Sequence, residues 1–226
     1  MMEPSHAVAR TKSFLGVEME IGQDVLVPRE ETELLGRAAC EILRQRGNRG
    51  TVVDMCCGAG NLACALATAF PETKILASDL TSGAVAAASA NVVRLGLTNR
   101  ITVRQGDLFA AIAPDLAKGE ADLIVCNPPY ISTGRLAAEK AYLLAAEPRE
   151  AFDGGPYGLS VHQRVIQEGL SFLKPDGWLA MEFGEGQHLQ IATLFRRARG
   201  YEAPDFLCDG HAIPRVVRAR RRAEMS

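Results

Sequence analysis

Short apolar runs alternate with segments of helical periodicity from residue 51 to the end of the chain. The apolar runs predict seven strands, near residues 51–56, 74–79, 101–107, 121–127, 178–183, 204–208 and 214–219. The helical patterns predict helices at 61–70, 81–95, 159–173 and 188–199. Strands that alternate with helices form mostly parallel sheets with helices on both faces. The last two strands have no helix between them, which predicts an antiparallel hairpin at one edge of this α/β fold.

The first fifty residues have a different pattern. Residues 13–29 (SFLGVEMEIGQDVLVPR) predict two short strands joined around Gly22. Residues 30–47 carry one apolar stripe at helical spacing and predict a helix with acidic residues in its first turn. We therefore expect residues 1–29 to form an extension with a short β-hairpin, and residues 30–226 to form the main domain.

Composition and charge narrow the class of protein. The chain has 226 residues, 47% of them hydrophobic, which suits one α/β domain with a full core. A formal net charge of −2 argues against a protein whose main role is to grip nucleic acid. No window holds the roughly 20 apolar residues that a membrane helix needs. The first residues lack the apolar core of a secretory signal, so we expect a cytoplasmic protein without a membrane partner.

The cysteines, histidines and arginines indicate neither a disulfide framework nor a metal site. The six cysteines lack C-x-x-C spacing and lie mostly in apolar runs, so we expect buried, reduced thiols. The four histidines are scattered without ligand spacing, so no metal is expected. Near the C-terminus, we expect Arg215 and Arg218 to flank the last strand. Arg220, Arg221 and Arg222 are expected in a solvated basic end.

A glycine-containing turn follows the strand predicted at 51–56. In VVDMCCGAGN, Asp54 lies near the end of the strand, and Gly58 and Gly60 form a G-x-G pattern. Glycines let the backbone approach a ligand, and the N-terminus of the next helix offers N–H donors. The longer dinucleotide pattern G-x-G-x-x-G is not completed, because Ala63 occupies its last position. Since alanine is tolerated there, this motif alone does not exclude NAD.

Acidic residues stand at the ends of the next two predicted strands. Asp79 lies about 20 residues after the turn, where a carboxylate binds ribose hydroxyls. It could also cap the helix that begins near Thr81, but ribose binding is the favoured interpretation. Asp107 can accept from a purine amino group or cap a turn, and the sequence favours neither.

The most specific motif is Asn127-Pro128-Pro129-Tyr130, directly after the fourth predicted strand. Its two prolines fix the backbone and remove two N–H donors, so the carbonyls remain available as acceptors. Asn127 adds a side-chain carbonyl, and Tyr130 adds an aromatic face for a planar group. Ligands bind at the carboxyl ends of such strands, so the motif suits the N–H groups of an amide or exocyclic amine. The alternative, a proline-rich turn with a buried tyrosine, is less common in this position.

In this order, VVDMCCGAGN, ASDL, GDLF and NPPY resemble the Rossmann-like class I methyltransferases that act on nitrogen. More narrowly, the chain resembles the HemK/PrmC-type protein-(glutamine-N5) methyltransferase family, which modifies peptide-chain release factors. Three flanking segments carry the narrower likeness: VLVPREETELL (25–35), EPREAFDGGPYGLSVHQRVI (147–166) and PDGWLAMEFGEGQ (175–187). The likeness runs from about Phe14 to the C-terminus.

The resemblance implies S-adenosylmethionine as methyl donor, S-adenosylhomocysteine as product and a glutamine amide in a release factor or other protein as acceptor. The implied cofactor contacts are Asp54, Gly58, Gly60, Asp79, Leu80, Asp107, Leu108 and Asn127. The implied catalytic, amide-recognising residues are Asn127, Pro128 and Tyr130. The implied substrate contacts are Arg29, Glu33, Pro129 and Tyr130. Glu147, Pro148 and Arg149 are expected to shape the opening or to form structural ion pairs.

The chain departs from the family pattern in two places. The family usually carries an N-terminal helical domain that helps to bind the factor. This chain begins almost at the predicted hairpin, so we expect it to lack that domain. Glu30 also stands where the family's P-R-P-E-T-E pattern has its second proline. Both departures concern the acceptor rather than methyl transfer itself.

Four other functions stay open at this stage. A small-molecule N-methyltransferase on the same core is the nearest, because it needs no docking domain. An adenine-N6 nucleic-acid methyltransferase would use the same NPPY motif, but the chain has little room for a target-recognition domain and only its end is basic. A binding protein without turnover would not need an intact NPPY. A dehydrogenase ranks last, because no acid/base partners for hydride transfer are evident.

Overall fold

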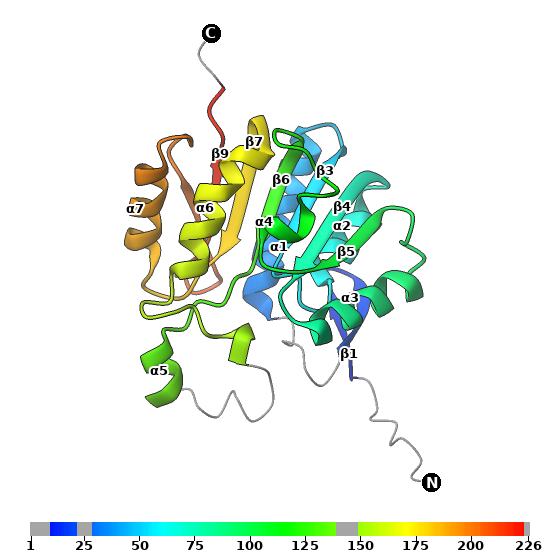
Figure 1. Ribbon diagram of the computed structural model, residues 1–226, viewed down its shortest axis with the longest axis horizontal. Helices are drawn as coiled ribbons and strands as arrows, with labels where there is room; N and C mark the ends of the chain where they lie inside the picture. Colours follow the sequence, from blue (N-terminus) through cyan, green and yellow to red (C-terminus); the bar gives the residue numbers. More distant parts are fainter. Residues whose placement is uncertain (1–9, 22–28, 139–148, 224–226) are drawn as a thin grey trace.

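The structure, a computed structural model, describes residues 10–21, 29–138 and 149–223. A seven-stranded sheet in the order β5-β4-β3-β6-β7-β9-β8 lies at its centre (Figure 1). Its strands are β3 (Arg49–Met55), β4 (Glu72–Asp79), β5 (Ile101–Gln105), β6 (Ala121–Cys126), β7 (Leu173–Glu182), β8 (Asp205–Cys208) and β9 (Pro214–Arg220). The strands from β5 to β7 pair in parallel, whereas β9 pairs antiparallel with both β7 and β8. The predicted mostly parallel sheet with an antiparallel hairpin at its edge is confirmed.

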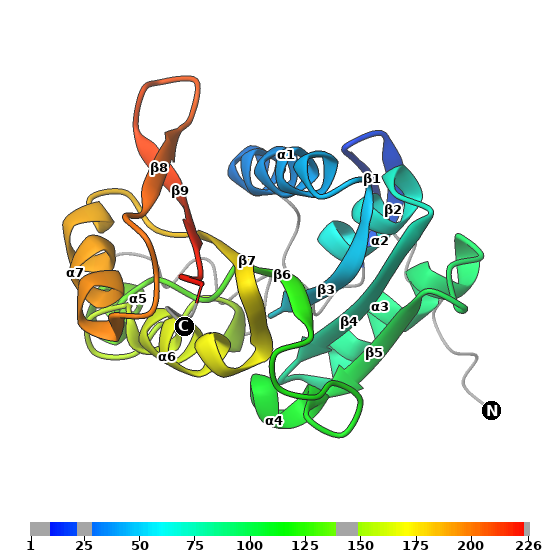
Figure 2. The same cartoon turned by 90° about the horizontal axis from the view of Figure 1, so that it is seen from above.

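Helices cover both faces of the sheet, as predicted. One face carries α1 (Glu30–Gln45), α2 (Asn61–Ala69) and α3 (Ser82–Arg94). The other carries α4 (Phe109–Ile112), α6 (Ser160–Phe172) and α7 (His188–Ala198). Figure 2 shows α1 and α6 on opposite sides of the sheet. Successive strand residues point to opposite faces, so Val52 packs in the core beneath the first group of helices and Val53 in the core beneath the second.

Three short helical elements are absent from the sequence-based prediction. They are α4, α5 (Thr133–Ala138) and the 3-10 turn η2 (Arg149–Ala151). Segments this short have too few positions to show a helical period. α5 lies apart from the helices that cover the sheet (Figure 1).

The predicted hairpin before α1 is present, but its turn lies elsewhere. β1 (Arg10–Phe14) and β2 (Val17–Ile21) pair antiparallel. Their turn is at Leu15–Gly16, with φ of +48° and +81°, and not around Gly22, which lies outside the described residues. Two central turn residues with positive φ match the right-handed twist of paired strands. That fit, rather than the presence of a glycine alone, decides where the chain reverses.

The hairpin is part of the main core. The alternating β2 residues Val17, Met19 and Ile21 are buried in the same cluster as the side chains of α1 and α2. Asn91 on α3 also binds the hairpin through its side-chain amide. Its Oδ1 accepts from Glu20 N at 2.9 Å, and its Nδ2 donates to Glu20 O at 2.8 Å. The same Nδ2 lies 3.1 Å from Ala59 O, so this amide connects the hairpin to the glycine-containing turn.

Two local expectations are wrong. The strand predicted at 178–183 starts earlier, because residues 174–177 are an irregular part of β7, where the pairing with β6 shifts register and Asp176 has φ +64°. A bulge accommodates turn-forming residues without ending the strand.

The second expectation concerns the basic end, and it is wrong only in part: β9 continues to Arg220 and the arginines meet acids or carbonyls, whereas Arg222 is exposed as expected. Arg218 pairs with Glu41 and Asp205 at 2.7 and 2.9 Å. Arg220 pairs with Asp176 at 2.9 Å, and Arg222 Nε donates to Tyr201 O at 2.8 Å.

Candidate active site

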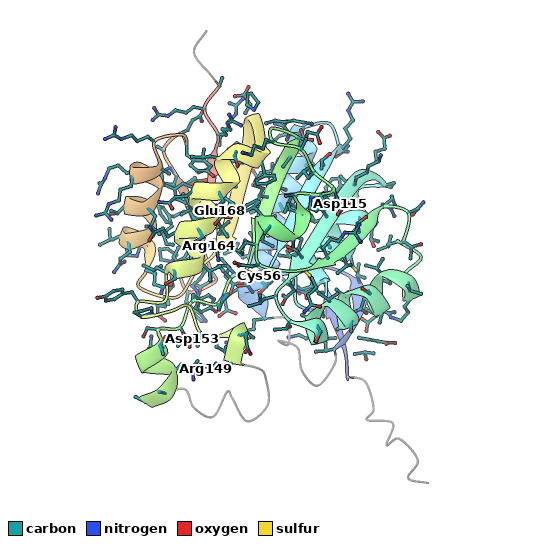
Figure 3. The ribbon with its side chains drawn as sticks, viewed as in Figure 1. Cys56, Asp115, Arg149, Asp153, Arg164 and Glu168 are labelled. Atoms are coloured by element: carbon teal, nitrogen blue, oxygen red, sulfur yellow. The ribbon has the colours of Figure 1, made fainter. Side chains whose placement is uncertain are left out.

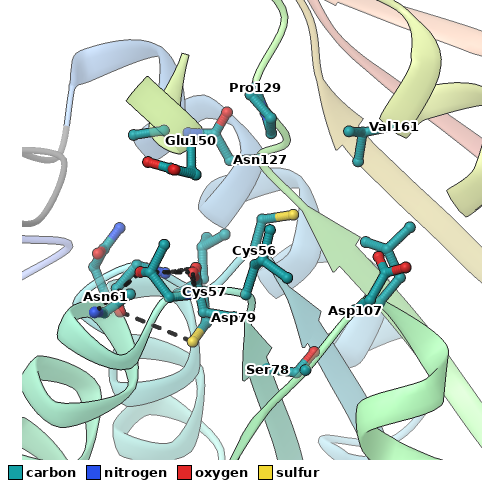
Figure 4. Close-up of a pocket in the computed structure, with 18 of the residues that line it drawn as sticks. Cys56, Cys57, Asn61, Ser78, Asp79, Asp107, Asn127, Pro129, Glu150 and Val161 are labelled. Atoms are coloured by element: carbon teal, nitrogen blue, oxygen red, sulfur yellow. Dashed lines mark hydrogen bonds between the residues drawn. The ribbon is translucent and has the colours of Figure 1, made fainter. Parts of the chain in front are cut away.

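One pocket lies at the carboxyl ends of β3, β4, β5 and β6, close to the N-termini of α2 and α3. The fold brings these ends together because the chain adds β4 and β5 on one side of β3, and β6 and β7 on the other. Ligands bind where the strand order reverses in this way. The predicted residues that line the pocket are Gly58, Asp79, Leu80, Asp107, Leu108, Asn127 and Pro129. In Figure 4, Asn127, Pro129 and Glu150 lie on one side of it, and Ser78 and Asp79 lie on the other.

Asp79 holds the glycine-containing turn and faces the pocket. Its Oδ2 accepts from Gly58 N at 3.0 Å, and its Oδ1 accepts from Thr81 N at 3.1 Å. Thr81, and not Asp79, is the N-cap of α3, since its hydroxyl accepts from Ala84 N at 3.3 Å. The Asp79 carboxylate therefore organises the pocket wall and still has lone pairs for a ligand.

Asp54 and Gly60 lie behind the pocket wall, outside its lining. Asp54 is fully buried, and its Oδ2 accepts from Ala63 N at 3.0 Å in the first turn of α2. Its Oδ1 has no partner among the described residues. Burial raises the pKa of the Asp54 carboxyl to about 7. Gly60 has φ +77°, and a Cβ there would lie 3.2 Å from the Cβ of Ala88, so this glycine permits close packing of α2 against α3.

Asp107 lies at the more open side of the pocket. Its Oδ1 forms an ion pair with Arg164 Nη1 on α6 at 2.8 Å, and both residues line the pocket. Figure 3 shows Arg164 beside Glu168 on α6, and Arg164 Nε also pairs with that carboxylate at 3.1 Å. Both side chains of the Arg164–Asp107 pair are about half exposed, so solvent screens their attraction. The Asp107 carboxylate therefore stays accessible to a ligand that enters this side.

The NPPY motif forms the loop that leaves β6. Asn127 and Pro129 line the pocket, whereas Pro128 is buried behind them. The motif is held by the loop before α6: Ile131 N donates to Phe152 O at 2.9 Å, and Gly154 N donates to Ile131 O at 2.8 Å. A Cβ on Gly154 would lie 2.7 Å from Pro129 O. The loop is thus fixed by backbone contacts that leave no space for a side chain.

Two side chains that sequence reasoning missed hold this motif from the other side. Asn127 Nδ2 donates to Thr32 Oγ1 at 3.1 Å, and Thr32 Oγ1 donates to Glu182 Oε2 at 2.8 Å. Tyr130 OH donates to the second oxygen, Glu182 Oε1, at 3.2 Å. Glu182 is 1% exposed, and burial raises the pKa of its carboxyl to about 7. An acid that ends the apolar strand sequence WLAME was the available signal, because a buried carboxylate needs a role or a partner.

The substrate residues predicted before and after the core lie outside the pocket lining. Glu33 pairs with Arg37 at 3.1 Å along α1. The guanidinium of Arg29 lies 5.9 Å from the ring centre of Phe152. Arg149 pairs with Asp153 at 2.9 Å, as Figure 3 shows below the sheet. Glu147 and Pro148 lie outside the described residues, whereas their neighbours Glu150 and Ala151 line the pocket, which the sequence did not indicate.

The described residues lack two features that would indicate other classes of protein. No group of three or more His, Cys, Asp or Glu side chains that could hold a metal ion occurs in the described part of the chain. No helix within the described ranges has the length and apolar character needed to cross a membrane.

The cysteines described by the structure are free. Cys57, Cys64 and Cys126 are buried as expected, whereas Cys40 and Cys56 are only partly buried and Cys208 is exposed.

Known proteins resemble the chain in sequence and in fold. The family model described as Methyltransferase small domain matches residues 37–155. The release factor glutamine methyltransferase of Geobacter sulfurreducens is 34% identical over 218 residues, which cover 96% of this chain and 73% of the relative. The ribosomal protein uL3 glutamine methyltransferase of Bradyrhizobium diazoefficiens is 41% identical over 138 residues, 61% of this chain and 42% of the relative.

The crystal structure of a ribosomal protein L11 methylase from Lactobacillus delbrueckii subsp. bulgaricus has a similar fold. Its TM-score to this chain is 0.63 at 18% identity, and the match covers 88% of this chain and 82% of that one. The fold is that of the class I methyltransferases.

Proposed function

Because the chain belongs to the family of release factor glutamine methyltransferases, we propose that it methylates the side-chain amide nitrogen of a glutamine in a peptide-chain release factor, in the cytoplasm. The methyl donor is S-adenosylmethionine. The observation that carries the proposal is the Asn127 amide. Its Nδ2 is bound to Thr32, and no described residue donates to its Oδ1, which leaves an oriented acceptor at the pocket.

The residues of the pocket fit the proposed methyl donor. Asp79 and Asp107 come from the ends of neighbouring strands, and a nucleoside offers ribose hydroxyls and an amino group to two such carboxylates. Gly58 and Leu80 would line the cofactor's path between them, with Leu108 against its base. Buried Asp54 Oδ1 lacks a partner beside this turn, which is the place for a further donor or an ordered water. When bound, the cofactor supplies an electrophilic methyl group on a sulfonium.

The chain's own contribution is to hold a poor nucleophile in place. We expect Asn127 Oδ1 and the Pro128 carbonyl to accept the two N–H groups of the glutamine amide, with Pro129 beside it. These bonds orient the nitrogen and raise its electron density, and correct positioning is worth a large part of the rate. The amide nitrogen bonds to the methyl carbon while the carbon–sulfur bond breaks with its electron pair left on sulfur. The nitrogen then loses one proton to water.

Tyr130 has a different role from the one that its motif suggests by itself. Its hydroxyl is bound to buried Glu182, and burial raises the pKa of the phenol further above its ordinary value. Tyr130 therefore stays neutral and anchors the loop through its bond to Glu182. We expect Arg29 and Glu33 to affect the acceptor only indirectly, through the start of α1.

The direct test is methyl transfer from isotope-labelled S-adenosylmethionine to purified, unmethylated release factor, read by mass spectrometry of its glutamine-containing peptides. We expect one labelled glutamine. Unlabelled factor, in a preparation that binds the cofactor, would refute the proposed acceptor.

A ribosomal protein is the second candidate acceptor, because the uL3 glutamine methyltransferase relative is 41% identical over its matched residues. Unmethylated uL3, a mixture of small amines and an adenine-containing oligonucleotide belong in the same assay. Label on one of these and not on the factor would identify the class of acceptor.

A further inference from the structure

A chain of three polar side chains runs from the pocket into the protein. Asn127 Nδ2 lies 3.1 Å from Thr32 Oγ1, and Thr32 Oγ1 lies 2.8 Å from Glu182 Oε2. The three residues come from the end of β6, the first turn of α1 and the end of β7. Thr32 and Glu182 are 2% and 1% exposed, so water does not compete for these bonds.

The number of protons available fixes which group donates in each of these two hydrogen bonds. A carboxylate only accepts, and a hydroxyl carries a single proton. Ionised Glu182 therefore accepts the hydrogen bond from the Thr32 hydroxyl. Only the lone pairs of Thr32 Oγ1 then face Asn127. The Asn127 amide must then turn its NH₂ group toward Thr32, and its carbonyl oxygen remains for the pocket.

We propose that Thr32 and Glu182 are positioning residues that select the amide-accepting orientation of Asn127. The inference rests on the proposed function, since it concerns how the same site presents its acceptor to an –NH₂ group. Glu182 lies outside the pocket lining, and Thr32 borders the pocket with 2% of its surface exposed. Their effect passes through the rotation of one side-chain amide.

Protonation of Glu182 reverses the orientation of the Asn127 amide. A carboxyl protonated on Oε2 donates to Thr32 Oγ1, and the hydroxyl proton of Thr32 is then free to point at Asn127. The amide satisfies that donor by turning its oxygen inward and its NH₂ group toward the pocket. A donor facing the donor groups of the substrate amide cannot orient it, so this state is inactive.

The surroundings place this change near neutral pH. Burial raises the pKa of Glu182 to about 7, while the bonds from Thr32 and Tyr130 and the charge of Arg215 oppose the rise. Arg215 Nη1 pairs with Glu31 Oε1 at 3.2 Å, and Glu31 itself raises the pKa of Glu182.

Two further side chains bond to the backbone at and next to Glu182: the His162 imidazole and the Arg215 guanidinium. His162 Nε2 lies 3.0 Å from Glu182 O, and burial lowers the pKa of this imidazole to about 4, so it stays neutral. Arg215 Nε lies 3.3 Å from Phe183 O on the following residue. Of the two buried groups Glu182 and His162, Glu182 is the one whose pKa lies near neutral pH.

The first test compares Thr32→Val with Thr32→Ser, using full-length protein, labelled cofactor and the methyl acceptor identified for the wild type. Valine keeps the shape and removes the hydroxyl, and we expect kcat to fall about 10- to 100-fold with cofactor affinity and KM changed much less. Serine keeps the hydroxyl and should restore most of the turnover. Equal turnover in the valine, serine and wild-type proteins would overturn the inference.

The second test is the dependence of kcat on pH. The wild type should lose activity as the pH falls through about 7, because Glu182 becomes protonated. Glu182→Gln should remove this dependence, since a side-chain amide does not titrate in this range of pH. Glu31→Gln should move the midpoint to lower pH, because it takes away a negative charge beside Glu182. A midpoint that stays unchanged in both variants would contradict the mechanism.

The two proposals fail in different ways. If the wild type binds the cofactor and transfers no methyl group to any protein amide, the proposed function fails. If the wild type methylates an amide and Thr32→Val matches it in kcat and in pH profile, only the positioning role fails.

Discussion

Asn127 and Glu182 show that the candidate site depends on where single polar groups are buried. Asn127 borders the pocket, yet its orientation is set by a hydroxyl and a carboxylate that are almost fully enclosed. A buried carboxylate is costly unless hydrogen bonds or charges compensate. Here Thr32, Tyr130 and Arg215 supply that compensation.

Asp79 provides the first test at this scale. We expect Asp79→Ala to weaken the binding of S-adenosylmethionine at least about 10-fold, because hydrogen bonds to a charged group are worth about 1.5–3 kcal/mol. Calorimetric titration of the purified variant measures the change. Asp115→Ala is the control, since Asp115 is an acid bound to Arg104 at 2.6 Å and lies outside the pocket lining. Equal affinities in the two variants would exclude the ribose-binding role.

His162 provides a test of stability against pH. Burial lowers its pKa to about 4 in the folded protein, whereas in the unfolded chain it is near 6.5. The unfolded state therefore binds more protons, and the contribution of His162 to stability is lost as the pH falls below 6.5. Between pH 7 and pH 5, the free energy of unfolding in urea should fall by about 2 kcal/mol more in wild type than in His162→Gln. Parallel pH profiles of the two proteins would contradict this.

Sequence reasoning predicted the residues of local motifs and missed those that depend on tertiary contacts. Asn127 and Asp79 are recognisable because each follows an apolar strand. Thr32 and Glu182 meet only after α1 packs beside β7, so no local pattern joins them. Gly60 was predicted to contact a ligand, but it packs against Ala88, because a glycine that approaches a ligand and one that approaches a helix look alike in sequence.

At the scale of elements, the loop after β6 and the loop before α6 form one unit. Their backbones are bonded at Ile131, and Gly154 N donates to Ile131 O. This pairing gives the NPPY loop a rigid support that does not involve the sheet.

Gly154→Ala tests that support. The added Cβ would lie 2.7 Å from Pro129 O and must displace backbone, so we expect kcat to fall about 10- to 100-fold with little change in cofactor affinity. Gly134→Ala is the control, because a Cβ at this position on α5 meets nothing within 4 Å. Steady-state kinetics gives kcat for both variants. Full activity in Gly154→Ala would show that displacement of the NPPY loop does not impair catalysis.

The N-terminal hairpin is expected to stabilise the whole domain. Met19 is 0% exposed in the core shared with α1 and α2, and Met→Ala at such sites costs about 2–5 kcal/mol. The neighbouring Glu18 has an exposed side chain, so Glu18→Ala should change stability very little. The free energy of unfolding in urea measures both. A small loss in Met19→Ala would indicate a loosely attached extension, as a domain boundary at 29/30 implies.

Elements were predicted best where periodicity is long. The seven strands and the helices of nine or more residues were found, while the short α4 and α5 and the position of the hairpin turn were not. The β7 bulge and the end of β9 also differ from the prediction, since pairing across the sheet extends strands through residues that favour turns.

At the scale of the whole molecule, the sheet order places the site. Because the chain winds from β3 to β5 on one side and from β6 to β7 on the other, the ends of β3 and β6 open a shared space. Cofactor-type residues follow β3, β4 and β5, and the acceptor-type residues follow β6. One edge of the sheet thus serves both partners of a transfer reaction.

The central claim is that this edge presents a glutamine amide, held by Asn127, to the methyl group of the donor. The most direct measurement is the rate of label transfer from S-adenosylmethionine to the glutamine of an unmethylated release factor, for wild type and for Asn127→Ala, with cofactor binding measured in both. We expect one labelled glutamine with wild type, and no detectable transfer with Asn127→Ala although this variant still binds the cofactor. Equal transfer by the two proteins would contradict the claim.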